Sequence, residues 1–172
     1  SACLVGSEMC IRDSRSSDDV GGMIVANNLK TQIGSFNSVL QNLSQGSAVT
    51  QTIDSALSEI VDILGYMREA AVAAESDTIS DAERTAYQDE IDAYVTAIDT
   101  ISTNATWNGT SLMSSATNMD IQTGVDSGSS TTLSFDEITA DILSIDDLDV
   151  ETSTTTAGTA VDTIDDALDT VN

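Results

Sequence analysis

Apolar residues recur at alternating steps of four and three residues from Val25 to Ala74, and this pattern limits the possible folds more than any other feature of the sequence. Most positions in this register are apolar, and the register does not slip. Such a heptad pattern predicts a long α-helix that packs against other helices along one face. The chain contains no Pro, the residue that would break such a helix.

We expect this first helix to run from about residue 18 to about residue 75, which corresponds to a length on the order of 85 Å at about 1.5 Å per residue. Ser17 and the acidic pair that follows it are typical of a helix start. A second apolar stripe lies beside the seam, so one partner helix is not enough, and we expect a bundle of at least three helices or a bundle within an assembly. The main seam residues are Leu29, Phe36, Leu43, Ile53, Leu57, Ile60, Leu64 and Met67.

A second helix is predicted from about residue 80 to about residue 103. Ser80 and Glu83 have the spacing of a capping box, in which each side chain bonds the backbone N–H of the other residue. The four-three spacing continues here, with Ile91 and Ile98 on the seam. Because the break between the two helices is short, we expect the second helix to return antiparallel onto the first.

The four-three spacing of apolar residues ends after the second helix, and we expect β-hairpins from about residue 106 to about residue 150. Asn108 and Gly109 form a dipeptide typical of a tight hairpin turn, and short runs of Thr, Ile, Val and Phe follow. We interpret the next Thr-rich stretch as a loop and predict a returning helix over about 159–172, truncated within its apolar seam. The predicted fold class is mainly α, a long antiparallel helical bundle or coiled-coil rod with a small β-hairpin region.

The formal net charge is −24, with 29 acidic residues, 5 basic residues and no His. This charge argues against binding to nucleic acid or to anionic membranes, because both attract cationic proteins. No run of about 20 apolar residues is present, so we expect no membrane insertion. The acidic surface has two interpretations: adaptation to a salty medium that screens self-repulsion, or a cation-binding surface, for which no EF-hand spacing is present.

Residue types that usually carry catalysis are poorly represented. Without His the chain lacks the commonest acid–base group, and it has no Gly-rich phosphate loop and no metal-ligand cluster. The acidic pairs Asp146–Asp147 and Asp165–Asp166 could supply an acid and a base, but adjacent residues on a helix do not face each other. We therefore expect no enzyme activity, no catalytic or metal site and no cofactor.

Five stretches of the sequence resemble bacterial flagellin, in the order in which that family has them. They are SRSSDDVGGMIVANNL, LSEIVDILGYMREAAVAAES, QDEIDAYVTAIDTISTNATWNGTSLM, DIQTGVDSGSSTTLSF and AVDTIDDALDTVN. In the third stretch Trp107 stands where the family has Phe. Together the stretches cover roughly residues 15–172, and the resemblance implies that these form a flagellin-like core domain without an outer variable domain.

The resemblance implies a structural function, as a subunit of the bacterial flagellar filament that polymerises into a helical tube for swimming motility. It also implies other flagellin subunits, an export chaperone and a filament cap as partners, and an extracellular location reached without a cleavable signal peptide. Two alternatives stay open: a hook–filament junction (hook-associated) protein, which shares the helical ends of flagellin, and a generic acidic coiled-coil scaffold. The match across the hairpin region favours flagellin.

The flagellin-sensing Toll-like receptor is a further partner that the resemblance implies. Tyr66 and Ala70 stand where a receptor-active flagellin has Arg and Leu, so one charge and one apolar anchor are missing and we expect weak or absent recognition. The residues that fit the family pattern, and that are also candidates for a subunit-contact surface, are Arg68, Glu69, Val72 and Glu90.

The beginning of the chain does not fit the rest. Residues Leu4 to Asp13 can be read in frame as the translation of a transposase-type sequencing adapter, so we interpret residues 1–14 as a non-native tail. This tail holds both cysteines, Cys3 and Cys10. We therefore do not interpret their spacing as a redox or metal-binding signal.

Overall fold

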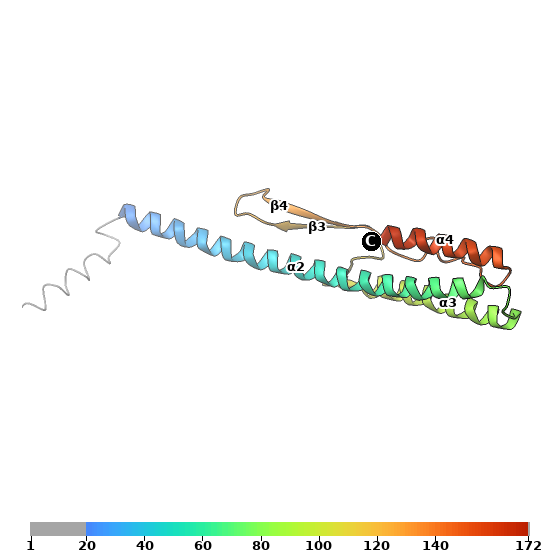
Figure 1. Cartoon of the computed structure of the whole chain (residues 1–172). Helices are drawn as coiled ribbons and strands as arrows, with labels where there is room; N and C mark the ends of the chain where they lie inside the picture. The colour runs from blue at the N-terminus through green and yellow to red at the C-terminus, as the bar shows by residue number, and fades with distance from the viewer. Residues whose placement is uncertain (1–19, 172) are drawn as a thin grey trace, which may run out of the picture. The chain divides into compact units, whose positions relative to one another are not determined.

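The structure, a computed structural model, describes residues 20–171 (Figure 1). The elements in chain order are α2 (Val20–Ala74), α3 (Asp81–Asn104), β1 (Thr106–Trp107), β2 (Thr110–Ser111), β3 (Thr117–Gln122), β4 (Ser130–Phe135) and α4 (Thr154–Val171). The prediction of a mainly helical fold with small β-hairpins is confirmed. The predicted cap at Ser17 and the interpreted tail of residues 1–14 lie outside the described residues.

The chain divides into two compact units. The described part of the smaller unit comprises residues 20–45 and 121–131, and that of the larger unit comprises residues 46–120 and 132–171. Helix α2 and the strands β3 and β4 each contribute residues to both units.

The core of the larger unit is built by three helices, namely the later turns of α2 together with α3 and α4, which lie side by side in Figure 1. Its fully buried side chains include Leu64 and Met67 from α2, Ile98 from α3 and Ile164 from α4. Each such side chain contributes roughly 1.5–3 kcal/mol when it leaves water. The prediction of a bundle of at least three helices is therefore confirmed for this unit.

Two sets of hydrogen bonds fix the short link between α2 and α3. Ser80 Oγ accepts from the Glu83 N–H (3.4 Å) and Glu83 Oε2 accepts from the Ser80 N–H (2.8 Å), which confirms the predicted capping box. The bond from the Ser80 backbone is the main reason why the pKa of Glu83 lies below its ordinary value. The buried Arg84 donates to the Ala74 carbonyl and, at 3.4 Å, to the Ser76 carbonyl. These bonds satisfy acceptors that a helix end leaves open.

Strands β1 and β2 form an antiparallel hairpin in which Trp107 lies opposite Thr110. The turn residues Asn108 and Gly109 have φ values of 49° and 81°. Positive φ at both central residues is what a type I′ turn requires, and Asn-Gly meets this requirement at little cost. The predicted hairpin turn is therefore confirmed. The chain leaves the hairpin into the core, where Leu112 is fully buried.

Strands β3 and β4 pair into a second two-stranded sheet, and their connection belongs to the smaller unit. Gln122 Nε2 donates to the carbonyls of Gly124 and Asp126, both at 2.8 Å, and the Ser129 carbonyl accepts from the Thr123 and Gly124 N–H groups. A Cβ at Gly124 would lie 2.6 Å from the Ser129 Cβ, so the close approach of the two chain segments requires glycine here.

The prediction of hairpins as far as residue 150 is wrong beyond Phe135, because residues 136–153 form turns and irregular backbone. The segment is nevertheless well packed, and it buries the apolar side chains Ala140, Leu143, Ile145, Leu148 and Val150. These residues join the core of the larger unit without forming a strand.

Polar side chains of α3 replace the strand partner that this segment would otherwise need. Gln88 donates from Nε2 to the Leu148 carbonyl and accepts at Oε1 from the Val150 N–H, both at 2.8 Å. Asp99 Oδ1 accepts from the Ala140 N–H at 3.0 Å. Because buried backbone groups must find partners, these bonds explain how the segment stays in the core without a ladder.

Helix α4 begins at Thr154, earlier than the predicted start near residue 159, so the interpretation of the Thr-rich stretch as a loop is wrong. Ser153 Oγ accepts from the Thr156 N–H, and Thr156 Oγ1 accepts from the Ser153 N–H, both at 3.1 Å. This reciprocal pair has the geometry of a capping box with Thr in the place of Glu. Ala157 then enters the core and fixes the first turn by burial.

Candidate subunit-contact surface

Two tyrosines from different helices stack on the surface of the larger unit. The ring centroids of Tyr66 in α2 and Tyr94 in α3 are 6.2 Å apart. The Tyr94 hydroxyl donates to Glu90 Oε1 at 2.9 Å, and this bond is the main reason why the pKa of Tyr94 is raised; the charge of Glu69 adds a smaller contribution. We call Tyr66, Glu69, Glu90 and Tyr94 the tyrosine–glutamate patch.

The tyrosine–glutamate patch is open to solvent. The side chain of Tyr66 is 55% exposed, Glu69 and Glu90 are exposed, and Tyr94 is half-buried. A ring face next to carboxylates attracts a cationic group, because both the ring quadrupole and the negative charges favour it. The arrangement therefore suits a cationic group.

Arg68 lies on the same helix but is directed to α4. Its Nε donates to Asp165 Oδ1 at 2.6 Å and its Nη2 to Asp165 Oδ2 at 3.2 Å. This two-point hydrogen bond, reinforced by the opposite charges, raises the pKa of Arg68 and lowers that of Asp165. The two side chains are about half exposed, so the pair orients α4 on α2 more than it stabilises the fold.

The four residues predicted for this surface are therefore not equivalent. Glu69 and Glu90 come together at Tyr94, whereas Arg68 is engaged by Asp165. Val72 is 45% exposed on α2.

The predicted seam residues also divide into two groups. Those of the larger unit are buried or half-buried, namely Ile53, Leu57, Ile60, Leu64, Met67, Ile91 and Ile98. Leu29, Phe36 and Leu43 in the smaller unit are 53%, 54% and 42% exposed. The described chain does not cover them, because the helices α3 and α4 that cover the later seam belong to the larger unit, so their place in a packed seam stays a prediction for an assembly.

The exposed seam residues belong to a broader apolar surface on the first turns of α2. Val39 is buried among them, but the other large side chains are not. Soluble proteins seldom leave so many apolar side chains uncovered in one place, and such a surface usually marks an interaction site. We call this the open apolar face, and its residues are Val25, Leu29, Ile33, Phe36, Leu40 and Leu43.

Sequence reasoning missed three residues that build this region. Asp165 was seen only as part of an acidic pair, and nothing in the spacing connects it with Arg68, 97 residues away. Gln88 and Arg84 carry no local signal, because their partners are backbone carbonyls and N–H groups brought near by the fold. The tyrosine stack had a partial signal, since Tyr94 follows Ile91 in the four-three register of the second helix.

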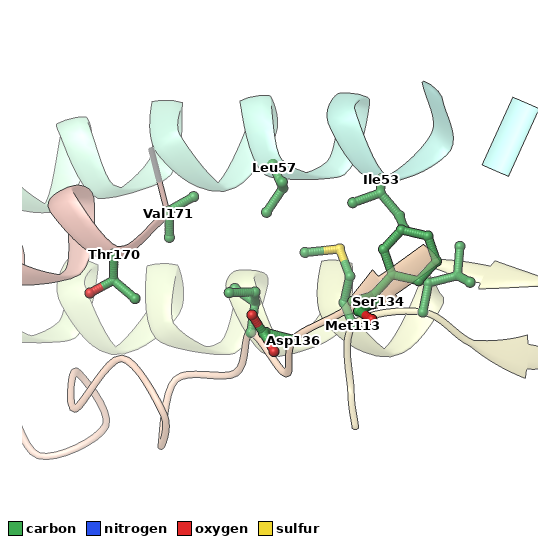
Figure 2. A pocket seen from close by; sticks show the side chains of 10 residues that line it. Ile53, Leu57, Met113, Ser134, Asp136, Thr170 and Val171 are labelled. Atoms are coloured by element: carbon green, nitrogen blue, oxygen red, sulfur yellow. The ribbon is translucent and has the colours of Figure 1, made fainter. Parts of the chain in front are cut away.

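A cavity of about 220 Å³ lies in the larger unit between the later turns of α2 and the end of α4 (Figure 2). In Figure 2 Ile53 and Leu57 reach toward it from α2 and Met113 from the segment after β2. Asp136 is the one carboxylate in the lining. The rest of the lining consists of apolar side chains and the two hydroxyl-bearing residues Ser134 and Thr170.

Among residues 20–171, no group of three or more His, Cys, Asp or Glu side chains is arranged to hold a metal ion. Within the same range no helix combines the length and apolar character needed to span a bilayer.

Comparison with known proteins identifies the family. Residues 12–118 match the family described as the bacterial flagellin N-terminal helical region. The chain belongs to the flagellin family. The match begins at residue 12, within the segment 1–14 that we interpret as a non-native tail. The exact limit of that tail therefore stays a prediction. The hook-associated protein and the generic scaffold are not favoured.

Individual relatives agree with the family match. The chain is 32% identical to flagellin from Escherichia coli O127:H6 and 31% identical to flagellin from Shigella flexneri, over 87% and 90% of this chain. It spans only 27% and 28% of the length of those two relatives. The crystal structure of Bacillus cereus flagellin superposes with a TM-score of 0.62 at 26% identity and covers 73% of each chain.

Proposed function

We propose that the chain is part of a structural subunit of the bacterial flagellar filament, which polymerises for swimming motility. Family membership supports this function, and the observation that carries it is the open apolar face of α2. A monomeric protein gains nothing from exposing this surface, whereas a polymer subunit can bury it against neighbours. The proposed partners are other copies of the subunit, with an export chaperone and a filament cap during export and growth.

The proposal includes an extracellular location, reached without a cleavable signal peptide, and no catalytic role. The strong acidity fits a protein that works outside the cell in a medium where salt screens its charge.

Genetic complementation tests the proposed function. The complete reading frame that contains this chain is expressed in a bacterium that lacks its own flagellin, and the cells are examined by electron microscopy with an antibody against residues 20–171. We expect labelled filaments and restored swimming. Export without any labelled filament, or label confined to the hook junction, would contradict the proposal.

We also propose that the flagellin-sensing Toll-like receptor recognises this chain weakly or not at all. Arg68 is engaged by Asp165, so it cannot form a new ionic contact without losing that pair, and Tyr66 supplies no positive charge at its position. A receptor reporter assay with the intact protein measures this. Activation as strong as that of a receptor-active flagellin at equal concentration would refute the proposal.

A further inference from the structure

The tyrosine–glutamate patch is a surface suited to a cation, and the chain itself offers few cations. Of its 5 Lys and Arg residues, Arg12 and Arg15 lie outside the described residues. Within residues 20–171 Arg68 is paired with Asp165, and Arg84 is buried against the end of α2. Lys30 remains on α2, and its exposed side chain forms no hydrogen bond or ion pair with the described residues.

Lys30 therefore matters for the contact between copies. Two copies that each carry a charge of −24 repel each other, and association is favoured where a cation of one copy meets negative charge on the other. The tyrosine–glutamate patch offers Glu69 and Glu90 together with the exposed Tyr66 ring, so that an ammonium group there gains ionic and cation–π contacts at once. Tyr94 holds Glu90 and supports the ring of Tyr66, which keeps the surface in place for its partner.

We propose that the tyrosine–glutamate patch binds the Lys30 ammonium group of a second copy of the chain, as a contact between neighbouring subunits. This inference rests on the proposed function, because it concerns the same assembly. It adds the chemistry of one contact and names the residue that each copy contributes. It also gives the exposed ring of Tyr66 a role in recognition.

Cross-linking in assembled filaments tests the contact directly. Filaments are grown from a mixture of unlabelled and heavy-nitrogen-labelled subunits of the complete reading frame and treated with a carbodiimide, which joins an amine to a carboxylate only where the two touch. We expect a cross-linked peptide of mixed isotope content that joins Lys30 to Glu69 or Glu90. Peptides joined only within one copy, coupling of Lys30 to other carboxylates, or no coupling of Lys30 would each overturn the inference.

Variants separate charge from packing. Lys30→Arg keeps the charge but removes the reactive amine, so filaments should form as before while the cross-link disappears. Lys30→Gln should raise the critical concentration for assembly about fivefold, as expected for one exposed cation–π contact. Glu59 is an exposed carboxylate on the same helix, and Glu59→Gln is the matched control. It should change neither the critical concentration for assembly nor the cross-link of Lys30. Unchanged assembly of Lys30→Gln would contradict the inference.

The inference and the proposed function fail in different ways. If the complete reading frame yields no filaments at all, the proposed function is wrong, and the inferred contact is then wrong as well. If filaments form but Lys30 is not coupled to the patch, the filament function stands and only the contact is wrong.

Discussion

Arg84 connects two helices through backbone carbonyls and not through an acidic partner. Its guanidinium is buried and donates to the carbonyls of Ala74 and Ser76, where α2 ends and would otherwise leave acceptors without partners. An arginine suits this position because its planar fork presents several donors at once. One side chain of α3 thereby closes the end of α2 and fixes the direction of the return.

We expect Arg84→Met to lower the free energy of unfolding by about 2–3 kcal/mol, because a methionine fills the space but leaves buried carbonyls without donors. Urea denaturation followed by circular dichroism measures the change. Arg84→Lys keeps the charge and part of the donors and should lose less. Equal stability of Arg84→Met and the parent chain would show that water satisfies these carbonyls instead.

Local residue signals were predictable where the partner is near in sequence. The Ser80–Glu83 capping box and the Asn108–Gly109 turn each depend on residues at most three positions apart, and both are present as expected. Arg84 could not be predicted in this way, because its acceptors lie eight and ten positions earlier and face it only after the chain has turned.

Helix α4 is held to α2 by apolar packing and by the pair of Arg68 and Asp165. The seam of α4 was predictable from its spacing, but its start was not, because the β-branched Thr run has low intrinsic helix propensity. Ser153 and the burial of Ala157 override this propensity. The tertiary pair of Arg68 with Asp165 was not predictable, since it depends on how two helices cross.

The ion pair of Arg68 with Asp165 gives the contact between α2 and α4 a defined pH dependence. Arg68 lowers the folded-state pKa of Asp165, so its stabilising contribution is present above the ordinary value of 3.8 and is lost as the pH falls through the lower folded-state pKa. We expect Asp165→Asn to lower Tm near neutral pH by up to about 4 °C. The difference from the parent chain should disappear well below pH 3.8, and a difference that persists there would point to packing.

Segment 136–153 depends on Gln88 for two backbone bonds. Gln88→Glu keeps an acceptor for the Val150 N–H but can no longer donate to the Leu148 carbonyl when it is ionised. We expect amide hydrogen exchange around residues 148–150 to accelerate about tenfold, corresponding to the loss of roughly one buried hydrogen bond. Gln51→Glu adds the same charge at an exposed site of α2 and is the control; similar acceleration in both variants would implicate charge alone.

The chain carries far more negative than positive charge, and within residues 20–171 most of its large exposed apolar side chains lie on the first half of α2. Both properties concern association more than folding. The spacing of apolar residues predicted the long apolar stripe of α2. It could not predict which part of that stripe other helices of the same chain bury. Leu64 and Phe36 occupy the same register, yet only Leu64 meets α3 and α4.

Assembly should require salt. With a net charge of −24 on each copy, repulsion between subunits is strong in dilute buffer and is screened at higher ionic strength. We expect the critical concentration for filament growth to fall steadily as sodium chloride is added, measured by sedimentation of filaments of the complete protein. Sodium sulfate at matched ionic strength controls for the anion. Equally efficient growth in very dilute buffer would mean that charge does not limit assembly.

The most direct test of the account compares solvent access to the open apolar face in free subunits and in filaments. Hydroxyl-radical footprinting with mass spectrometry reports oxidation of Leu29, Phe36 and Leu43, which are exposed in the described chain, and of Leu64, which is buried in it. We predict that assembly strongly protects the first three residues and leaves the low oxidation of Leu64 unchanged. Oxidation of Leu29, Phe36 and Leu43 at the same rate in filaments and free subunits would contradict the claim that this face is buried by filament formation.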